Sequence, residues 1–227
     1  MKILAVDTAL GACSACVLDG DVVRAHSFEP MERGHAERLA PMVRETMNAA
    51  GIEFAALDRL AVTTGPGTFT GQRIGYAFMR GLRLALKLPL IGVTTLEAMA
   101  AAALEETGAA AVAVLHDARR GEVYFALVSK DGVVLPVGLA SFDVAVSSIR
   151  DAISQMSPGP LAFAGTAGHQ AADACRGVRS EVLLSHVQQP DALFVAHLSS
   201  RMPEPREIPR PLYLRAPDAK LPAGSGP

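Results

Sequence analysis

The sequence predicts an α/β protein made of two similar lobes, of which the second is the smaller. Short aliphatic segments alternate with segments of helical periodicity, an order that implies parallel strands with helices on the faces of a sheet. The layout occurs twice, because three short strands open each half of the chain. We therefore expect a first lobe over residues 1–107, a smaller second lobe over residues 108–202 and a tail over residues 203–227.

Each lobe is predicted to begin with a β-meander. In the first lobe, Asp19-Gly20-Asp21 is typical of a hairpin turn, and Asp131-Gly132 has the same character in the second. In both lobes, further strands follow the meander and alternate with helices. The predicted strands cover residues 2–6, 12–18, 22–28, 57–64, 90–93, 111–116, 122–128, 133–137, 161–164 and 182–184.

The predicted helices are recognised by their periodicity and by their ends. Gly51 is a natural stop for the first helix, and Pro41 predicts a kink there or a start close to it. Thr94 and Glu97 have the spacing of a capping box, and Asp191 can cap the last helix. The predicted helices cover residues 34–50, 71–87, 95–106, 142–156, 167–175 and 192–202.

The composition indicates a cytoplasmic protein without a nucleic-acid surface of its own. Half of the 227 residues are hydrophobic, but no apolar run approaches the roughly 20 residues of a membrane span, and Asp7 interrupts the first run too early for a signal peptide. The net charge is only -2, so nucleic acid contacts would have to come through a partner. Cys13 and Cys16 point to opposite faces of a strand, which favours buried thiols over a metal or redox pair.

A glycine-rich turn passes directly into a long helix within residues 63–87. Such a turn presents unpaired backbone N–H groups that suit an anion, yet no lysine follows the glycines, as a P-loop would require. Two interpretations stay open: a nucleotide contact, or a tight turn in which the aspartate after the first strand only bonds its own backbone. The possible nucleotide contacts are Asp7, Thr8, Gly65, Gly67 and Thr68.

The helix over residues 71–87 is too apolar for one core. Its apolar arc spans roughly 220°, whereas packing against a single core needs only about 100°. Either the helix is buried inside its own lobe, or one side covers the sheet and the other meets a partner, which is the interpretation we favour. With the helix around residues 39–47, the expected partner interface consists of Leu39, Met42, Met47, Gly71, Ile74, Gly75, Phe78, Met79 and Leu82.

Five strings together resemble the TsaD/TsaB family and its TsaB-type (YeaZ) members in particular. They are ILAVDTA at the start, GPGTFTGQRIG, PLIGVTTLEAMA, DARRGEVY and PLYLR near the end. Thr68 and Gln72 depart conservatively from the family string, which has Ser and Leu there. The resemblance implies an actin-like ATPase (ASKHA) fold, shared with Hsp70 and sugar kinases, with two ribonuclease-H-like lobes.

The resemblance also implies a pathway, the bacterial synthesis of N6-threonylcarbamoyladenosine in tRNAs that read codons starting with A. In that system TsaD transfers the threonylcarbamoyl group, TsaB is its partner and TsaE is an ATPase that joins them. TsaD-like members carry two histidines on the helix after the PLIGV-type strand, where this chain has Thr95 and Met99, and neither replaces a nitrogen ligand for a divalent ion.

We therefore expect a non-catalytic subunit with no activity alone, which binds and organises TsaD. Its partners would be TsaD and TsaE, with tRNA reached through the complex, and alone it would form a homodimer through the same face. No cofactor is expected on this chain alone, while ATP and a metal ion would belong to the partner subunits. The alternatives are a stand-alone nucleotide-binding ATPase of actin-like fold and a glycoprotease-like peptidase.

The tail is expected to dock in part. It is rich in proline, but residues 211–215, the PLYLR string, are apolar enough to pack against a lobe. The end of the tail is expected to be disordered.

Overall fold

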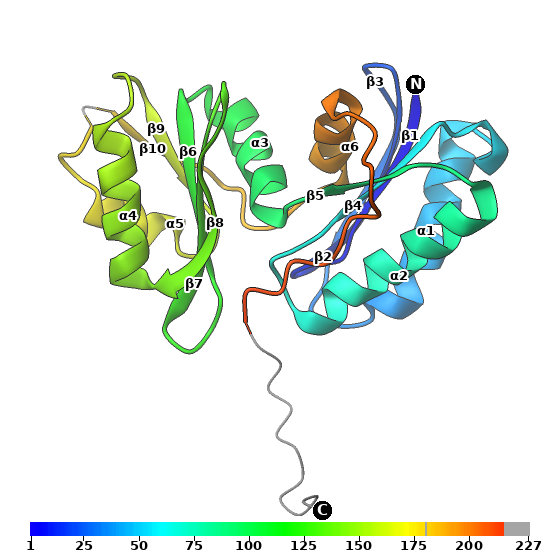
Figure 1. The fold of residues 1–227 in the computed structure, drawn as a ribbon, viewed down its shortest axis with the longest axis horizontal. Helices are drawn as coiled ribbons and strands as arrows, with labels where there is room; N and C mark the ends of the chain where they lie inside the picture. Colours follow the sequence, from blue (N-terminus) through cyan, green and yellow to red (C-terminus); the bar gives the residue numbers. More distant parts are fainter. Residues whose placement is uncertain (180, 216–227) are drawn as a thin grey trace, which may run out of the picture.

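The structure is a computed structural model that describes residues 1–179 and 181–215, and it contains two five-stranded sheets with helices on both faces of each (Figure 1). The strand orders are β3-β2-β1-β4-β5 and β10-β9-β6-β7-β8. The predicted α/β class with two mixed sheets is therefore confirmed. The expectation of a disordered end falls on residues outside the described ones.

The first sheet combines an antiparallel meander with two parallel strands. β1 pairs antiparallel with β2, β2 with β3, and β1 pairs parallel with β4, which pairs parallel with β5. β1 and β4 are buried almost throughout because helices cover both faces of the sheet. The strands are β1 (Lys2–Asp7), β2 (Ala12–Asp19), β3 (Val22–Pro30), β4 (Arg59–Thr63) and β5 (Leu90–Val93).

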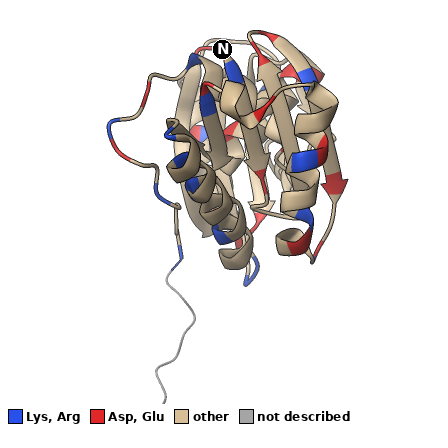
Figure 2. Ribbon diagram, turned by 90° about the vertical axis from the view of Figure 1, so that its right-hand side faces the viewer, with Lys and Arg blue, Asp and Glu red and all other residues tan. Residues whose placement is uncertain are grey.

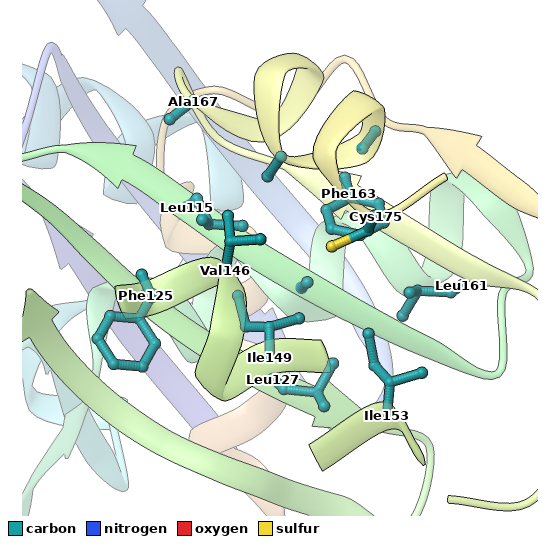
Figure 3. Close-up of a cluster of buried hydrophobic side chains, with 14 of the residues drawn as sticks. Leu115, Phe125, Leu127, Val146, Ile149, Ile153, Leu161, Phe163, Ala167 and Cys175 are labelled. Atoms are coloured by element: carbon teal, nitrogen blue, oxygen red, sulfur yellow. The ribbon is translucent and has the colours of Figure 1, made fainter. Parts of the chain in front are cut away.

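The second sheet repeats this topology. β6, β7 and β8 form the meander, and β6 pairs parallel with β9, which pairs parallel with β10. Its outer face and the helices over it enclose an apolar cluster that includes Phe125, Ile149 and Phe163 (Figure 3). The strands are β6 (Ala111–Asp117), β7 (Glu122–Ser129), β8 (Gly132–Ser141), β9 (Leu161–Ala164) and β10 (Val182–Leu184).

Helices α1 and α2 lie side by side on the outer face of the first sheet (Figure 1, Figure 2), and α4 and α5 cover the outer face of the second. α1 contains Pro41 and is flanked by Gly34 and Gly51, both of which have a left-handed backbone conformation. Among residues 1–179 and 181–215, no helix is both long and apolar enough to cross a membrane. The helices are α1 (His35–Ala50), a 3-10 turn (Phe54–Ala56), α2 (Phe69–Leu86), α3 (Thr95–Thr107), α4 (Phe142–Ser154), α5 (Gly168–Ala174) and α6 (Ala192–Arg201).

Two helices cover the sheet of the other lobe. α3 was expected in the first lobe, but it packs against β6, β7 and β9, and α6 was expected in the second lobe, but it packs against β1 and β2. The two helices also contact each other between the sheets (Figure 1). Helical periodicity identifies an apolar side but not the sheet that buries it, so the sequence could not indicate this exchange.

Candidate functional site

The turn after β1, the loop before α2 and the tail meet at an open pocket of about 480 Å³ between the lobes. Leu10 and Phe69 line it from the first lobe, and Ala118 and Tyr124 from the second. Residues 212–215 of the tail form a further wall. The pocket is therefore built from three separate parts of the chain.

The turn after β1 and the glycine loop are in direct backbone contact. The Thr8 hydroxyl donates to the Gly71 carbonyl oxygen at 2.7 Å and accepts from the Gly75 N–H at 3.0 Å. A Cβ on Gly71 would lie 2.2 Å from the Thr8 carbonyl oxygen, and one on Gly67 would lie 2.3 Å from the Ala9 carbonyl oxygen. Glycine is required at these two positions because the two segments approach so closely.

Three backbone donors at the start of α2 are hydrogen-bonded within the chain. The Thr68 hydroxyl accepts from the Gly71 N–H at 3.1 Å, and the Thr68 carbonyl accepts from the Gln72 N–H at 3.0 Å. The Thr68 N–H donates to the Ala9 carbonyl at 2.9 Å. A nucleotide is the group that the predicted fold implies, and these three N–H groups are already hydrogen-bonded within the chain.

Asp7 is fully buried at the end of β1 and does not line the pocket. Its Oδ1 accepts from the Thr63 hydroxyl at 2.5 Å and from the Ala9 N–H at 3.1 Å, whereas Oδ2 has no partner among the described residues. Burial raises the pKa of this carboxyl to about 7. Such a carboxyl links the end of β1, the turn that follows β1 and the end of β4, and it is enclosed by the protein.

The predicted nucleotide contacts are therefore divided between two environments. Gly67 and Thr68 line the pocket, whereas Asp7, Thr8 and Gly65 are buried. The sequence pattern placed all five near one turn, but it could not show that Thr8 is used by the backbone of α2.

The outer face of α2 is exposed and apolar. Leu84 is 67% exposed, and the small residues Ala77, Gly81 and Ala85 are exposed beside it. They lie on the side of the helix opposite Met79, which is fully buried against the first sheet. The spacing of these small residues was a signal for a second face, but the predicted interface did not include them.

The structure buries most of the residues predicted for the partner interface. Ile74, Phe78 and Leu82 are half-buried, and they pack against the core of the first lobe. The other six cannot contact a partner directly, because the lobe itself encloses them. These six are Leu39, Met42, Met47, Gly71, Gly75 and Met79.

The helix that would carry a metal site in TsaD-like proteins is an internal helix here. Thr95 and Met99 are fully buried at its start. Glu97 forms the predicted capping box with Thr94, since the Thr94 hydroxyl accepts from the Glu97 N–H and the Glu97 carboxylate accepts from the Thr94 N–H. Within the described ranges, no three His, Cys, Asp or Glu residues are grouped as a metal site would require.

The family comparison matches the middle of the chain. A family model described as TsaD, tRNA N6-adenosine threonylcarbamoyltransferase, matches residues 29–171. The chain is also similar to the tRNA threonylcarbamoyladenosine biosynthesis protein TsaB of Escherichia coli, with 44% identity over 131 residues. That match covers 58% of this chain and 56% of the relative, so the chain spans little more than half of that protein.

Solved structures extend the similarity over nearly the whole chain. A Pseudomonas aeruginosa protein described as similar to peptidase YEAZ has a TM-score of 0.76 and 30% identity, and the match covers 94% of this chain and 99% of that one. A hexokinase of the ROK class from Thermus thermophilus has a TM-score of 0.51 at 14% identity, over 88% of this chain and 100% of that one. The hexokinase likeness concerns the fold alone, and the predicted actin-like ATPase fold is confirmed.

Proposed function

Because the chain belongs to the TsaD/TsaB family, we propose that it is a non-catalytic subunit in the synthesis of threonylcarbamoyladenosine in tRNA, where it binds and organises a TsaD partner. The name of the Escherichia coli relative supports the pathway. The observation that carries the partner role is the exposed apolar face of α2.

This face has the properties of a helix-packing surface. Ala77, Gly81 and Ala85 lack long side chains, so the backbone of another helix can come close, and Leu84 supplies an apolar side chain to fill the contact. Figure 2 views the molecule from this side and shows uncharged stretches on the helices between their charged positions. Because α2 has 18 residues, this face is long enough for a second helix to pack along it.

Charge adds a preference for one kind of partner. α2 and its C-cap contain Arg73, Arg80, Arg83 and Lys87 but no acidic residue. We therefore expect the partner's helix to be apolar at its centre with carboxylates at its rim. In the absence of TsaD, a second copy of this chain would bind to the same face of α2. This homodimer would be weaker than the complex with TsaD, because like charges face each other in it.

The non-catalytic role follows from the helix that begins at Thr95. Where TsaD-like proteins have two imidazoles, this chain has the buried hydroxyl of Thr95 and the buried thioether of Met99. Neither group replaces a nitrogen ligand for a divalent metal ion. TsaD would therefore supply the metal ion and the transfer, TsaE would supply ATP hydrolysis, and tRNA would be contacted through the complex.

The test is a charge placed on the α2 face. Leu84→Glu would place a carboxylate in the centre of the contact, and we expect binding to purified TsaD to weaken by roughly tenfold or more, measured by size exclusion with light scattering. The matched control is Val144→Glu, because Val144 is also an exposed apolar residue on a helix, 56% exposed, but on α4 of the second lobe.

The two variants together decide the proposal. Loss of TsaD binding in Leu84→Glu alone, with circular dichroism unchanged in both variants, supports the α2 interface. Equal binding by both variants and the unmodified chain would exclude this face as the interface.

A further inference from the structure

The tail after α6 runs along the first lobe toward the second (Figure 1). The Tyr76 hydroxyl donates to the Pro209 carbonyl at 2.6 Å, and the Leu212 N–H donates to the Thr64 carbonyl at 2.7 Å. The ring of Pro209 lies over Gly92, where a Cβ would come within 2.6 Å of the proline Cβ. The tail thus packs against α2, β5 and the end of β4.

An aromatic and cationic cluster holds the next part of the tail. The rings of Tyr213 and Phe69 are 5.5 Å apart, and the Arg73 guanidinium lies 3.6 Å from the centre of the Phe69 ring. The Arg73 Nε–H also donates to the Tyr213 hydroxyl at 3.1 Å. Tyr213 thus has a tilted ring contact with Phe69 and a hydrogen bond from Arg73, whose guanidinium also lies 5.9 Å from the centre of the tyrosine ring.

Arg215 then reaches the second lobe. One of its N–H groups donates to the Ala118 carbonyl at 3.0 Å, and its guanidinium forms an ion pair with the Glu122 carboxylate. Ala118 and Glu122 flank the turn between β6 and β7, in which Arg119 has a left-handed backbone with φ of 63° and its carbonyl oxygen lies 3.5 Å from an Arg215 nitrogen. The tail is thereby bonded to both lobes at the mouth of the pocket.

We propose that residues 209–215 are an intramolecular clamp that holds the two lobes at one angle across the mouth of the pocket. Among the described residues, the chain passes between the two sheets after β5 and after β10, and the tail adds a third crossing. The clamp lines the pocket between the turn after β1, the glycine loop and the second lobe, so the chain itself supplies a link between the lobes there. The clamp needs no partner, so it does not depend on the proposed role with TsaD.

The experiment measures the distance between the lobes in the isolated chain. Cysteines introduced by Glu37→Cys on α1 and Asp151→Cys on α4 carry spin labels on the outer faces of the two lobes. The native cysteines are buried, and burial raises the pKa of the Cys13 and Cys16 thiols to about 12, so the labels react with the introduced cysteines.

Arg215→Ala removes the link to the second lobe, and Arg210→Ala is the matched control. Arg210 belongs to the same tail, but its side chain is 87% exposed and pairs with Glu207 at 4.0 Å. By pulsed electron resonance we expect one narrow distance in the labelled parent chain and in the Arg210 variant, and a broader distribution reaching longer distances in the Arg215 variant.

Glu122→Gln tests the same bond from the second lobe and leaves the tail sequence intact. It should broaden the distribution in the same direction as Arg215→Ala. A distribution that matches the parent in both variants would overturn the clamp, and so would equal broadening by Arg210→Ala.

Discussion

At the scale of single residues, Asp7 is the group with the most unusual environment. One carboxylate oxygen ties the end of β1 to Thr63 on β4, and the other has no partner among the described residues. A buried carboxyl with one unpartnered oxygen is most stable when it carries a proton. Burial raises the pKa of Asp7 to about 7, so the buried carboxyl carries a proton below that pH and loses it above that pH.

Asp7 should make the protein less stable as pH rises. Burial raises its pKa from 3.8 to about 7 in the folded state, so between these values the folded chain binds more protons than the unfolded chain, and the free energy of unfolding falls with pH. From pH 5 to pH 8 the free energy of unfolding should fall by about 3 kcal/mol more in the unmodified protein than in Asp7→Asn, because the asparagine has no proton to release. Urea unfolding of both proteins across this range measures the difference.

The comparison with Asp7→Asn isolates this carboxyl, because every other titratable group is present in both proteins. If the two free energies of unfolding keep a constant difference from pH 5 to pH 8, the carboxyl is not protonated in the fold.

At the scale of elements, α2 has two sides with different roles. One side packs Gly71 and Gly75 on Thr8 and buries Met79 against the first sheet. The other side presents Gly81 and Leu84 to the surface. The same helix thus positions the turn after β1 and offers the surface that we assign to the partner.

Two glycine-to-alanine changes should separate these sides. Gly71→Ala places a Cβ 2.2 Å from the Thr8 carbonyl oxygen, and we expect it to lower the free energy of unfolding by more than about 2 kcal/mol. Gly81→Ala meets nothing within 4 Å and should raise that free energy by about 0.5–1 kcal/mol, since alanine favours the helix. Both values come from urea unfolding, and a destabilisation of similar size in both variants would contradict the assigned sides.

The elements themselves could be predicted because their signals are local. β9 (Leu161–Ala164) has the predicted bounds, and the capping box of Thr94 and Glu97 is formed as predicted. The side of α2 that is buried could not be predicted, since Met79 and Leu84 are both apolar and only the position of the sheet distinguishes them. For this reason the predicted interface, which stays untested as a binding surface, includes six residues that the structure buries in the first lobe.

At the scale of the whole molecule, the two lobes are joined more tightly than their order in the sequence suggests. α3 and α6 each cover the sheet of the other lobe, and the tail bonds to both lobes through Tyr213 and Arg215. These contacts join residues far apart in the chain, so periodicity and turn signals carry no information about them. The result is one body in which the described residues leave the outer side of α2 uncovered.

The most direct test of the account is tRNA modification by a reconstituted system of TsaD, TsaE, tRNA and threonylcarbamoyl adenylate. We predict that threonylcarbamoyladenosine forms when this chain or its Val144→Glu variant is added, and that the rate falls at least roughly tenfold when the chain is omitted or carries Leu84→Glu. Modification that proceeds at the same rate without this chain would contradict a role as the organising subunit.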